Sequence, residues 1–147
     1  MMFVATLLIH AAMLGFMVFF VAVISPSALK ALDMPSASKF LRYVFPRIFA
    51  FGFVVATAAT FTAFLAPPSP ARLISLTSAL FFLVNWLVLT PKINTQRDLM
   101  LAGDAAAPAA QAAKSRFGRL HGLSVGLYLL QMGGSAAVIL LLYPTLG

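Results

Sequence analysis

MMFVATLLIHAAMLGFMVFFVAVI, residues 1–24, is a run that contains no charged side chain. As a helix rising about 1.5 Å per residue it would be about 36 Å long, enough to cross a hydrocarbon core about 30 Å thick. It is too long for the apolar part of a signal peptide and lacks a basic leader, so we expect it to stay as a membrane helix. Uncharged runs of similar length follow, which predict spans over residues 2–24, 48–66, 73–90 and 122–142.

The composition excludes an ordinary water-soluble domain. Hydrophobic residues make up 62% of the chain and charged residues 9%, whereas soluble domains are about 45–50% apolar and about 25% charged. No run alternates apolar and polar residues as a barrel strand does, so the fold class is all-α. The net charge of +7 comes without a nucleic-acid-binding module, and we expect no nucleic-acid partner. The absence of cysteine excludes disulfides and thiolate chemistry.

The basic residues decide the topology. Nine of the ten lie in the segments that follow the first and third spans: Lys30, Lys39, Arg42, Arg47, Lys92, Arg97, Lys114, Arg116 and Arg119. Because basic loops stay in the cytoplasm, residues 25–47 and 91–120 are predicted to be cytoplasmic and both termini to lie outside. The prediction is a single transmembrane domain over residues 1–147, an up-down-up-down four-helix bundle.

Both cytoplasmic segments are predicted to contain helices. Residues 36–45 begin with a capping-type serine, Ser36, and would run into the second span through a kink at Pro46. Residues 92–100 would extend the third span, and the alanine-rich residues 105–113 would be a helical start to the fourth or a mobile tip. We favour helices that protrude into the cytoplasm.

Glycines recur on one side of the fourth span: Gly118, Gly122, Gly126, Gly133 and Gly134. Small residues at this spacing let two helix backbones approach each other in lipid. The pattern predicts packing within the chain, with a homodimer face as the alternative.

The only ionisable group inside the first span is His10, and such residues are candidates for function. Met13 and Met17 share its helix face, and Met132 is predicted to lie at a similar depth. Imidazole and thioether ligands suit Cu(I). The alternatives are a neutral His10 hydrogen-bonded to another helix, with the methionines as packing, or another ligand or proton role.

Three more polar side chains lie in or at the edge of the spans. His121 is about 20 Å in depth from His10 by helical rise, which excludes one haem bound by both, although a histidine–methionine haem at His10 stays open. Asn85 and Gln131 are expected to hydrogen-bond between helices or to line a cavity.

The densest polar region is predicted at the cytoplasmic ends of the spans. Its members are Arg47, Lys92, Asn94, Arg97, Asp98, Arg119 and His121. We expect Asp98 to pair with Arg119 or Arg47. The cations would anchor the helices to anionic lipid headgroups or form a pocket for an anionic lipid or small anion.

Four short segments carry a family resemblance: SPSALKAL (25–32), FPR (45–47), TPKIN with RD (90–98) and FGRLHGLS (117–124). They resemble the family of small four-span proteins named for transmembrane protein 205, whose bacterial members are usually labelled a domain of unknown function. The resemblance covers essentially the whole chain and implies a four-helix bundle in a bacterial inner membrane. That family is distantly similar to the copper-resistance D and membrane protoporphyrinogen oxidase groups, in which a first-span histidine at the place of His10 is familiar. The oxidase's later intramembrane basic residue has no counterpart here.

No catalytic motif is present in the sequence. The leading hypothesis is therefore a non-enzymatic integral membrane protein that binds or helps move a small ligand or metal. The alternatives are a haem- or porphyrin-linked redox enzyme that uses His10 and a scaffold that binds anionic lipid.

Overall fold

Four long helices make up the fold. The computed structural model describes residues 1–102 and 106–146, and within them it contains helices and no strands. The all-α prediction is therefore confirmed. The first and third long helices each contain a short π-helical segment, and the second and fourth are unbroken α-helices. The elements are α1 (Met2–Phe19), η1 (Phe20–Ile24), α2 (Ser25–Ala31), α3 (Met34–Leu65), α4 (Ala71–Val84), η2 (Asn85–Leu89), α5 (Thr90–Leu101), α6 (Pro108–Leu142) and the 3₁₀ turn η3 (Tyr143–Leu146).

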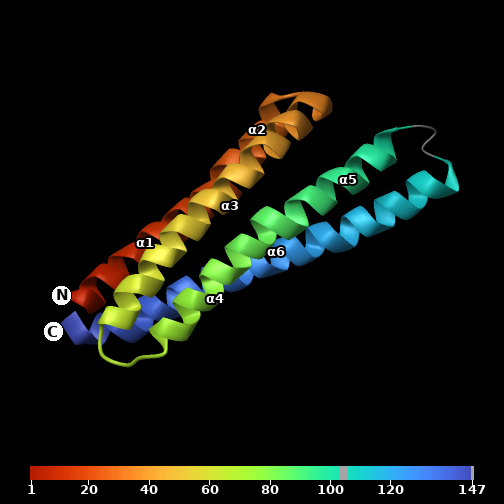
Figure 1. Ribbon diagram of the computed structural model, residues 1–147. Helices are drawn as coiled ribbons and strands as arrows, with labels where there is room; N and C mark the ends of the chain where they lie inside the picture. The colour runs from red at the N-terminus through yellow and green to blue at the C-terminus, as the bar shows by residue number, and fades with distance from the viewer. Residues whose placement is uncertain (103–105, 147) are drawn as a thin grey trace.

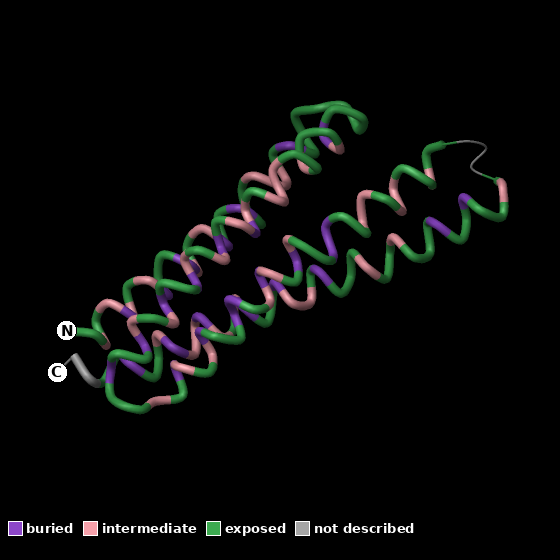
Figure 2. The backbone as a smooth tube through the Cα atoms, in the orientation of Figure 1, coloured by how far each residue is buried: buried purple, intermediate pink, exposed green. Residues whose placement is uncertain are grey.

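The helices form an up-down-up-down bundle. Helix α3 lies against α1 and α4, and α6 lies against α1, α4 and α5. Both termini lie at the same end of the bundle (Figure 1), as predicted. Each of the four long helices is long and apolar enough to cross a membrane. Buried positions line the facing sides of the helices, while the outward sides are mostly exposed (Figure 2). The chain is therefore an integral, multi-pass membrane protein with an apolar surface that suits lipid contact.

Helix α3 begins two residues earlier than expected and at a different cap. The Asp33 side chain accepts a hydrogen bond from the Ser36 backbone N–H at 3.3 Å, so Asp33 and not Ser36 is the capping residue. Hydrogen bonds from the side chain and backbone of Ser36 lower the pKa of the Asp33 carboxyl. The helix continues through Pro46 to Leu65, which confirms that the polar segment and the second span form one helix.

The helices on either side of the second polar segment also extend beyond the apolar runs. Helix α5 continues past Pro91 to Leu101, as expected, and α6 begins at Pro108, where proline at the first turn is well tolerated. The alanine-rich stretch is therefore helical from Pro108 onward. Asp104 and Ala105 lie outside the described residues.

Each π-helical segment directly precedes a hydroxyl residue and a proline. Segment η1 is followed by Ser25–Pro26 and η2 by Thr90–Pro91. Proline has no N–H and its ring clashes with the carbonyl four residues earlier, and a wider turn relieves both problems. In the second case the Thr90 hydroxyl donates to the Asn85 carbonyl at 2.7 Å, which satisfies an acceptor near the break.

The two halves of the chain repeat each other. Five buried positions of the first long helix recur 65 residues later in the third, and one such pair, His10 and Ser75, is in direct contact. The pairs are Thr6 with Ala71, His10 with Ser75, Met13 with Ser78, Met17 with Phe82 and Phe20 with Asn85.

The second and fourth long helices repeat in the same way. Aligning Gly52 with Ser124 also aligns buried Ala56 with Tyr128 and buried Ala63 with Ser135. The fold is therefore two similar helical hairpins packed together, α1–α3 and α4–α6. The two π-helical segments lie at equivalent places, and the hairpins diverge toward the ends that lie away from the termini (Figure 1).

The bundle core is apolar and aromatic where the hairpins meet. Phe82 is fully buried, and its ring lies 6.3 Å from the Tyr128 ring and 6.2 Å from that of Phe16, centroid to centroid. A Cβ atom added at Gly52 would overlap the Phe82 ring. Gly52, which the sequence pattern did not single out, is thus the residue that lets α3 approach α4.

Arg72 closes the turn between the second and third spans. Its Nε donates to the Ala63 carbonyl and its Nη2 to the Phe64 carbonyl, both at 3.2 Å, and Nη2 also donates to the Ala66 carbonyl. These carbonyls belong to the C-terminal end of α3, where helical acceptors have no intrahelical donor and a positive charge is favourable.

Replacing Arg72 with glutamine should lower the free energy of unfolding by about 1 kcal/mol, because a single amide cannot serve three carbonyls. Arg72→Lys should restore little of this, since an ammonium cannot span the same acceptors. Thermal unfolding in detergent measures both variants. Equal stability of the glutamine variant and the parent would contradict the capping role.

Candidate functional site

A cleft of about 240 Å³ lies between the two hairpins, on the side toward which they diverge. Both π-helical breaks lie close to it, because Phe20, Ser25 and Thr90 belong to its wall. The remaining lining residues come from α3, α5 and α6 and from one η1 position: Val21, Arg42, Phe45, Phe49, Ile93, Asn94, Arg97, His121, Ser124, Val125, Tyr128 and Leu129. Among the residues that the structure describes, no acidic side chain lines the cleft.

Aromatic rings form one wall of the cleft. The Phe45 ring lies 5.3 Å from the Phe20 ring and 5.8 Å from the Phe49 ring, centroid to centroid. Phe49 in turn makes an edge contact with Tyr128 at 6.1 Å. These rings come from η1, α3 and α6, so the wall connects the two hairpins. It offers a rigid apolar surface for the body of a ligand.

Hydroxyl and amide groups form the inner wall. The Ser124 hydroxyl donates to Asn85 Oδ1 at 2.6 Å, and Thr90 donates to the Asn85 carbonyl. Asn85 is fully buried, and its Nδ2 has no hydrogen-bond partner in the described part of the chain. Asn85 thus makes the interhelical hydrogen bond that its place in the third span predicts, directly behind the cleft wall.

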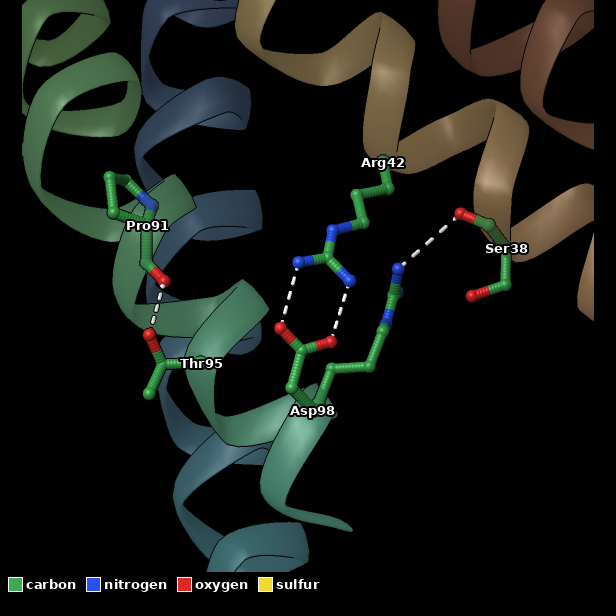
Figure 3. Close-up of polar contacts among 6 residues, drawn as sticks. Ser38, Arg42, Pro91, Thr95 and Asp98 are labelled. Atoms are coloured by element: carbon green, nitrogen blue, oxygen red, sulfur yellow. Dashed lines mark hydrogen bonds and ion pairs between the residues drawn. The ribbon is translucent and has the colours of Figure 1, made fainter. Parts of the chain in front are cut away.

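An ion pair joins the hairpins beside the cleft. Arg42 Nη1 and Nη2 donate to Asp98 Oδ1 and Oδ2 at 2.6 and 2.8 Å (Figure 3). The prediction that Asp98 pairs with Arg119 or Arg47 is therefore wrong. The reason is tertiary: the second hairpin places α5 opposite the start of α3, and Arg42 lies on the face of α3 that meets it. This two-pronged geometry uses both carboxylate oxygens of Asp98 for Arg42.

The Arg97 guanidinium is the least compensated charge of the cleft. It is partly buried, and it makes a long hydrogen bond from Nη1 to the Ser38 carbonyl at 3.5 Å. Its charged carbon lies 5.4 Å from the Phe117 ring, which stacks on His121 at 5.7 Å. Asp98 attracts Arg97 electrostatically but gives both its oxygens to Arg42, so Arg97 keeps N–H donors and a positive charge that favour an anionic partner.

The other predicted rim residues separate into three groups. Asn94, Arg97 and His121 line the cleft. Arg47 instead donates to the Tyr43 carbonyl at 2.8 Å and lies over the Tyr43 ring. The sequence pattern missed Arg42 and the aromatic wall, because nothing in the order of residues shows which side of α3 faces the second hairpin. Lys92 and Arg119 lie in a different groove.

His10 lies in the bundle core and is fully buried. Its Nε2 is 2.8 Å from the Ser75 hydroxyl oxygen, and that hydroxyl donates its single proton to the Ala71 carbonyl at 2.7 Å. Ser75 therefore accepts from His10, which places the ring proton on Nε2. The remaining nitrogen, Nδ1, is an acceptor that has no partner in the described residues.

The methionines predicted beside His10 belong to the apolar core. Met13 and Met17 are fully buried in the cluster that contains Phe82 and Tyr128, and Met132 packs against it. Among the described residues no three His, Asp or Glu side chains gather as a metal site. A metal ion at this level would thus depend on His10 Nδ1 and thioethers, a soft donor set that suits Cu(I). Copper and haem binding stay predictions.

Gln131 makes a second buried polar link between helices. Its Nε2 donates to the Ser78 backbone carbonyl at 2.9 Å, and the Gln131 backbone carbonyl accepts from the Ser135 hydroxyl. Its Oε1 has no partner within the described chain. Gln131 therefore joins α4 to α6, in agreement with a role in packing specificity.

The glycines of α6 divide into two kinds. A Cβ added at Gly134 would meet Ile74 at 3.1 Å, so this glycine allows close approach to α4. Of the described atoms, none lies within 4 Å of a Cβ added at the other four, Gly118, Gly122, Gly126 and Gly133. Packing within the chain therefore does not account for those four, and the homodimer face stays a prediction.

Comparison with known proteins gives one result. A family model described as Domain of unknown function (DUF4149) matches residues 8–100. The matched region contains His10, Asn85, Arg97 and Asp98, and ends before α6. No curated protein and no solved structure matches the chain.

Proposed function

Because this chain belongs to the DUF4149 family, which is defined by sequence and not by an activity, we propose a function from the cleft itself. The protein binds a small amphipathic anion between its two hairpins. The observation that supports this most directly is the pairing of an aromatic wall with Arg97, which forms no salt bridge with an acidic side chain in the described part of the chain.

The ion pair beside the cleft makes Arg97 the anion-binding residue. Asp98 holds Arg42 by two hydrogen bonds, so Arg42 is already neutralised. Arg97 has further N–H donors, and a guanidinium binds a carboxylate or phosphate through two parallel hydrogen bonds. An anion here would also compensate the charge of a guanidinium that is partly buried.

The size of the cleft limits the ligand. Its volume of about 240 Å³ lies below the range of about 300–1,000 Å³ that is typical of drug-sized ligands. A carboxylate on one ring system or on a short hydrocarbon would fit, with its apolar body against Phe45 and Phe49. The arrangement offers binding and orientation, and we propose a binding or transport-related role in preference to catalysis.

The position of the cleft in the cell follows from the charge distribution. We propose that the diverging ends of the hairpins, with residues 25–47 and 91–120, lie in the cytoplasm of a bacterium and that both termini lie outside. The cleft would then open at the cytoplasmic surface of the inner membrane. We also propose, on the segments quoted above, that the chain is related to the transmembrane protein 205-like proteins.

The test uses two ring compounds that differ in charge. Radiolabelled 2-naphthoate carries a carboxylate, and 2-naphthamide is its neutral counterpart. The purified full-length protein in detergent should bind naphthoate more tightly, and Arg97→Gln should weaken naphthoate about tenfold while leaving naphthamide unchanged. The tenfold loss corresponds to about 1.4 kcal/mol, the lower end for a hydrogen bond to a charged group.

The matched control is Arg119→Gln, which removes the same charge from a residue outside the cleft. It should leave the affinities for both compounds unchanged. An equal loss of naphthoate affinity in the two variants would refute the proposed function. So would a parent protein that binds naphthoate no more tightly than naphthamide. The thermal midpoint of each variant shows whether it is folded.

A further inference from the structure

We propose that the groove on the outer face of the α5–α6 hairpin binds the headgroup of a membrane lipid in which two phosphates are joined by a glycerol that keeps one free hydroxyl. The cations of this groove are Lys92, Arg116 and Arg119. The inference does not depend on the function proposed for the cleft.

The groove is separate from the cleft. It has a volume of about 650 Å³ and is widely open, and none of its lining residues also lines the cleft. On α5 the groove is lined by Lys92, Thr95 and Gln96, whereas the cleft takes Ile93 and Asn94 from the opposite face of the same helix. The two sites therefore lie on opposite sides of the α5–α6 pair.

The three cations of the groove have no acidic partner in the described part of the chain. The only salt bridge there joins Arg42 to Asp98, neither of which lines the groove, and Asp33 caps α3. Three neighbouring positive charges repel one another, so a ligand with at least two negative charges is favoured over one with a single charge.

The apolar side of the groove indicates a lipid as the source of these charges. Leu120 and Leu123 continue the groove along α6 from Arg119 into the uncharged run of the fourth span. Pro91, at the groove edge, directly follows the uncharged run of the third span. Cations at the ends of spanning helices with an apolar wall beside them match a headgroup and the start of its acyl chains.

Gln96 lines the groove and carries a hydrogen-bond acceptor that a ligand could use if the side chain turned toward it. Its Oε1 is buried and has no partner among the described residues. The nearby Thr95 hydroxyl already donates to the Pro91 carbonyl at 3.1 Å (Figure 3). A phosphate offers acceptors only, whereas a glycerol hydroxyl between two phosphates can donate to Gln96 while the phosphates meet the cations.

The experiment compares lipid retention by native mass spectrometry. Full-length protein is placed in nanodiscs that contain equal amounts of cardiolipin, phosphatidylglycerol and phosphatidylethanolamine, and the bound lipids are counted after release. The parent should retain one cardiolipin per chain in preference to the other two lipids. The variant Lys92→Gln/Arg116→Gln/Arg119→Gln should lose about 100-fold in cardiolipin affinity, which corresponds to about 1 kcal/mol per basic residue.

The control removes the same number of charges elsewhere. Lys30→Gln/Lys39→Gln/Lys114→Gln changes residues that line neither the groove nor the cleft, and it should retain cardiolipin as the parent does. Equal loss in both triple variants would show bulk charge attraction and overturn the site. Displacement of cardiolipin by an equimolar amount of inorganic pyrophosphate would assign the groove to a free anion and also overturn it.

A single substitution tests the hydrogen bond to the glycerol hydroxyl without changing the charge of the groove. Gln96→Leu removes the buried acceptor and keeps all three cations, so it should reduce the preference for cardiolipin over phosphatidylglycerol severalfold. An unchanged preference would contradict the role of Gln96. Binding of 2-naphthoate to the same variants reports on the cleft, so failure of the lipid site and failure of the proposed function are distinguished.

Discussion

Replacing Gly52 with valine should destabilise the protein by about 2–3 kcal/mol, because the new side chain would have to occupy the position of the Phe82 ring. Phe82 is fully buried and is held between Phe16 and Tyr128, so its ring has no exposed space to move into. The measurement is the loss of helical signal during unfolding in mixed detergent micelles. The variant should unfold at a clearly lower denaturant fraction than the parent.

The matched control is Gly15→Val, which makes the same change on α1. No described atom lies within 4 Å of a Cβ at Gly15, so only the helix propensity changes, by a few tenths of a kcal/mol. Comparable loss in the two variants would mean that helix propensity and not contact with Phe82 governs the effect.

Phe82→Ala should destabilise the bundle about as much as Gly52→Val, because it leaves a cavity where the valine would create a clash. Membrane lipid is as apolar as the core, so the transfer of the ring contributes little and the cavity term dominates. A cavity on the order of 100 Å³ at about 24 cal/mol per Å³ corresponds to about 2–3 kcal/mol. The same unfolding assay measures the loss, and Leu80→Ala, at an exposed position of the same helix, is the control.

The two substitutions should compensate when they are combined. In Gly52→Val/Phe82→Ala the valine can enter the space that the ring leaves. The loss of unfolding free energy in the double variant should therefore be smaller than the sum of the two single losses by about 1 kcal/mol or more. Additive losses would show that Gly52 and Phe82 act independently and would contradict the close approach of α3 to α4.

The helices themselves could be predicted because each depends on neighbours in the sequence. The uncharged run at residues 1–24 and its three counterparts are long enough to cross a membrane whatever packs against them. The extension of the third long helix beyond Pro91 was also predictable, since residues 92–100 contain no glycine or proline that would end it. Ser36 was the wrong cap because Asp33, three residues before it, accepts from the Ser36 N–H and so starts the helix earlier.

The partners of the polar side chains could not be predicted. The sequence places Asp98 at the same charged helix ends as Arg47 and Arg119, yet Asp98 pairs with Arg42. Which of several cations an acid meets depends on the rotation of each helix about its own axis. The hydrophobic pattern leaves that rotation open in a membrane, where outward and inward faces are both apolar.

The sequence by itself determined that this is a four-span, all-helical membrane protein, because crossing a hydrocarbon layer requires only length and the absence of charge. Only the tertiary structure decided that Arg97 lines an aromatic cleft, that Gly52 receives the Phe82 ring, and that the cations of α5 and α6 divide between two opposite faces. These features arise where two hairpins far apart in the chain meet. Their geometry depends on contacts between side chains that no local pattern records.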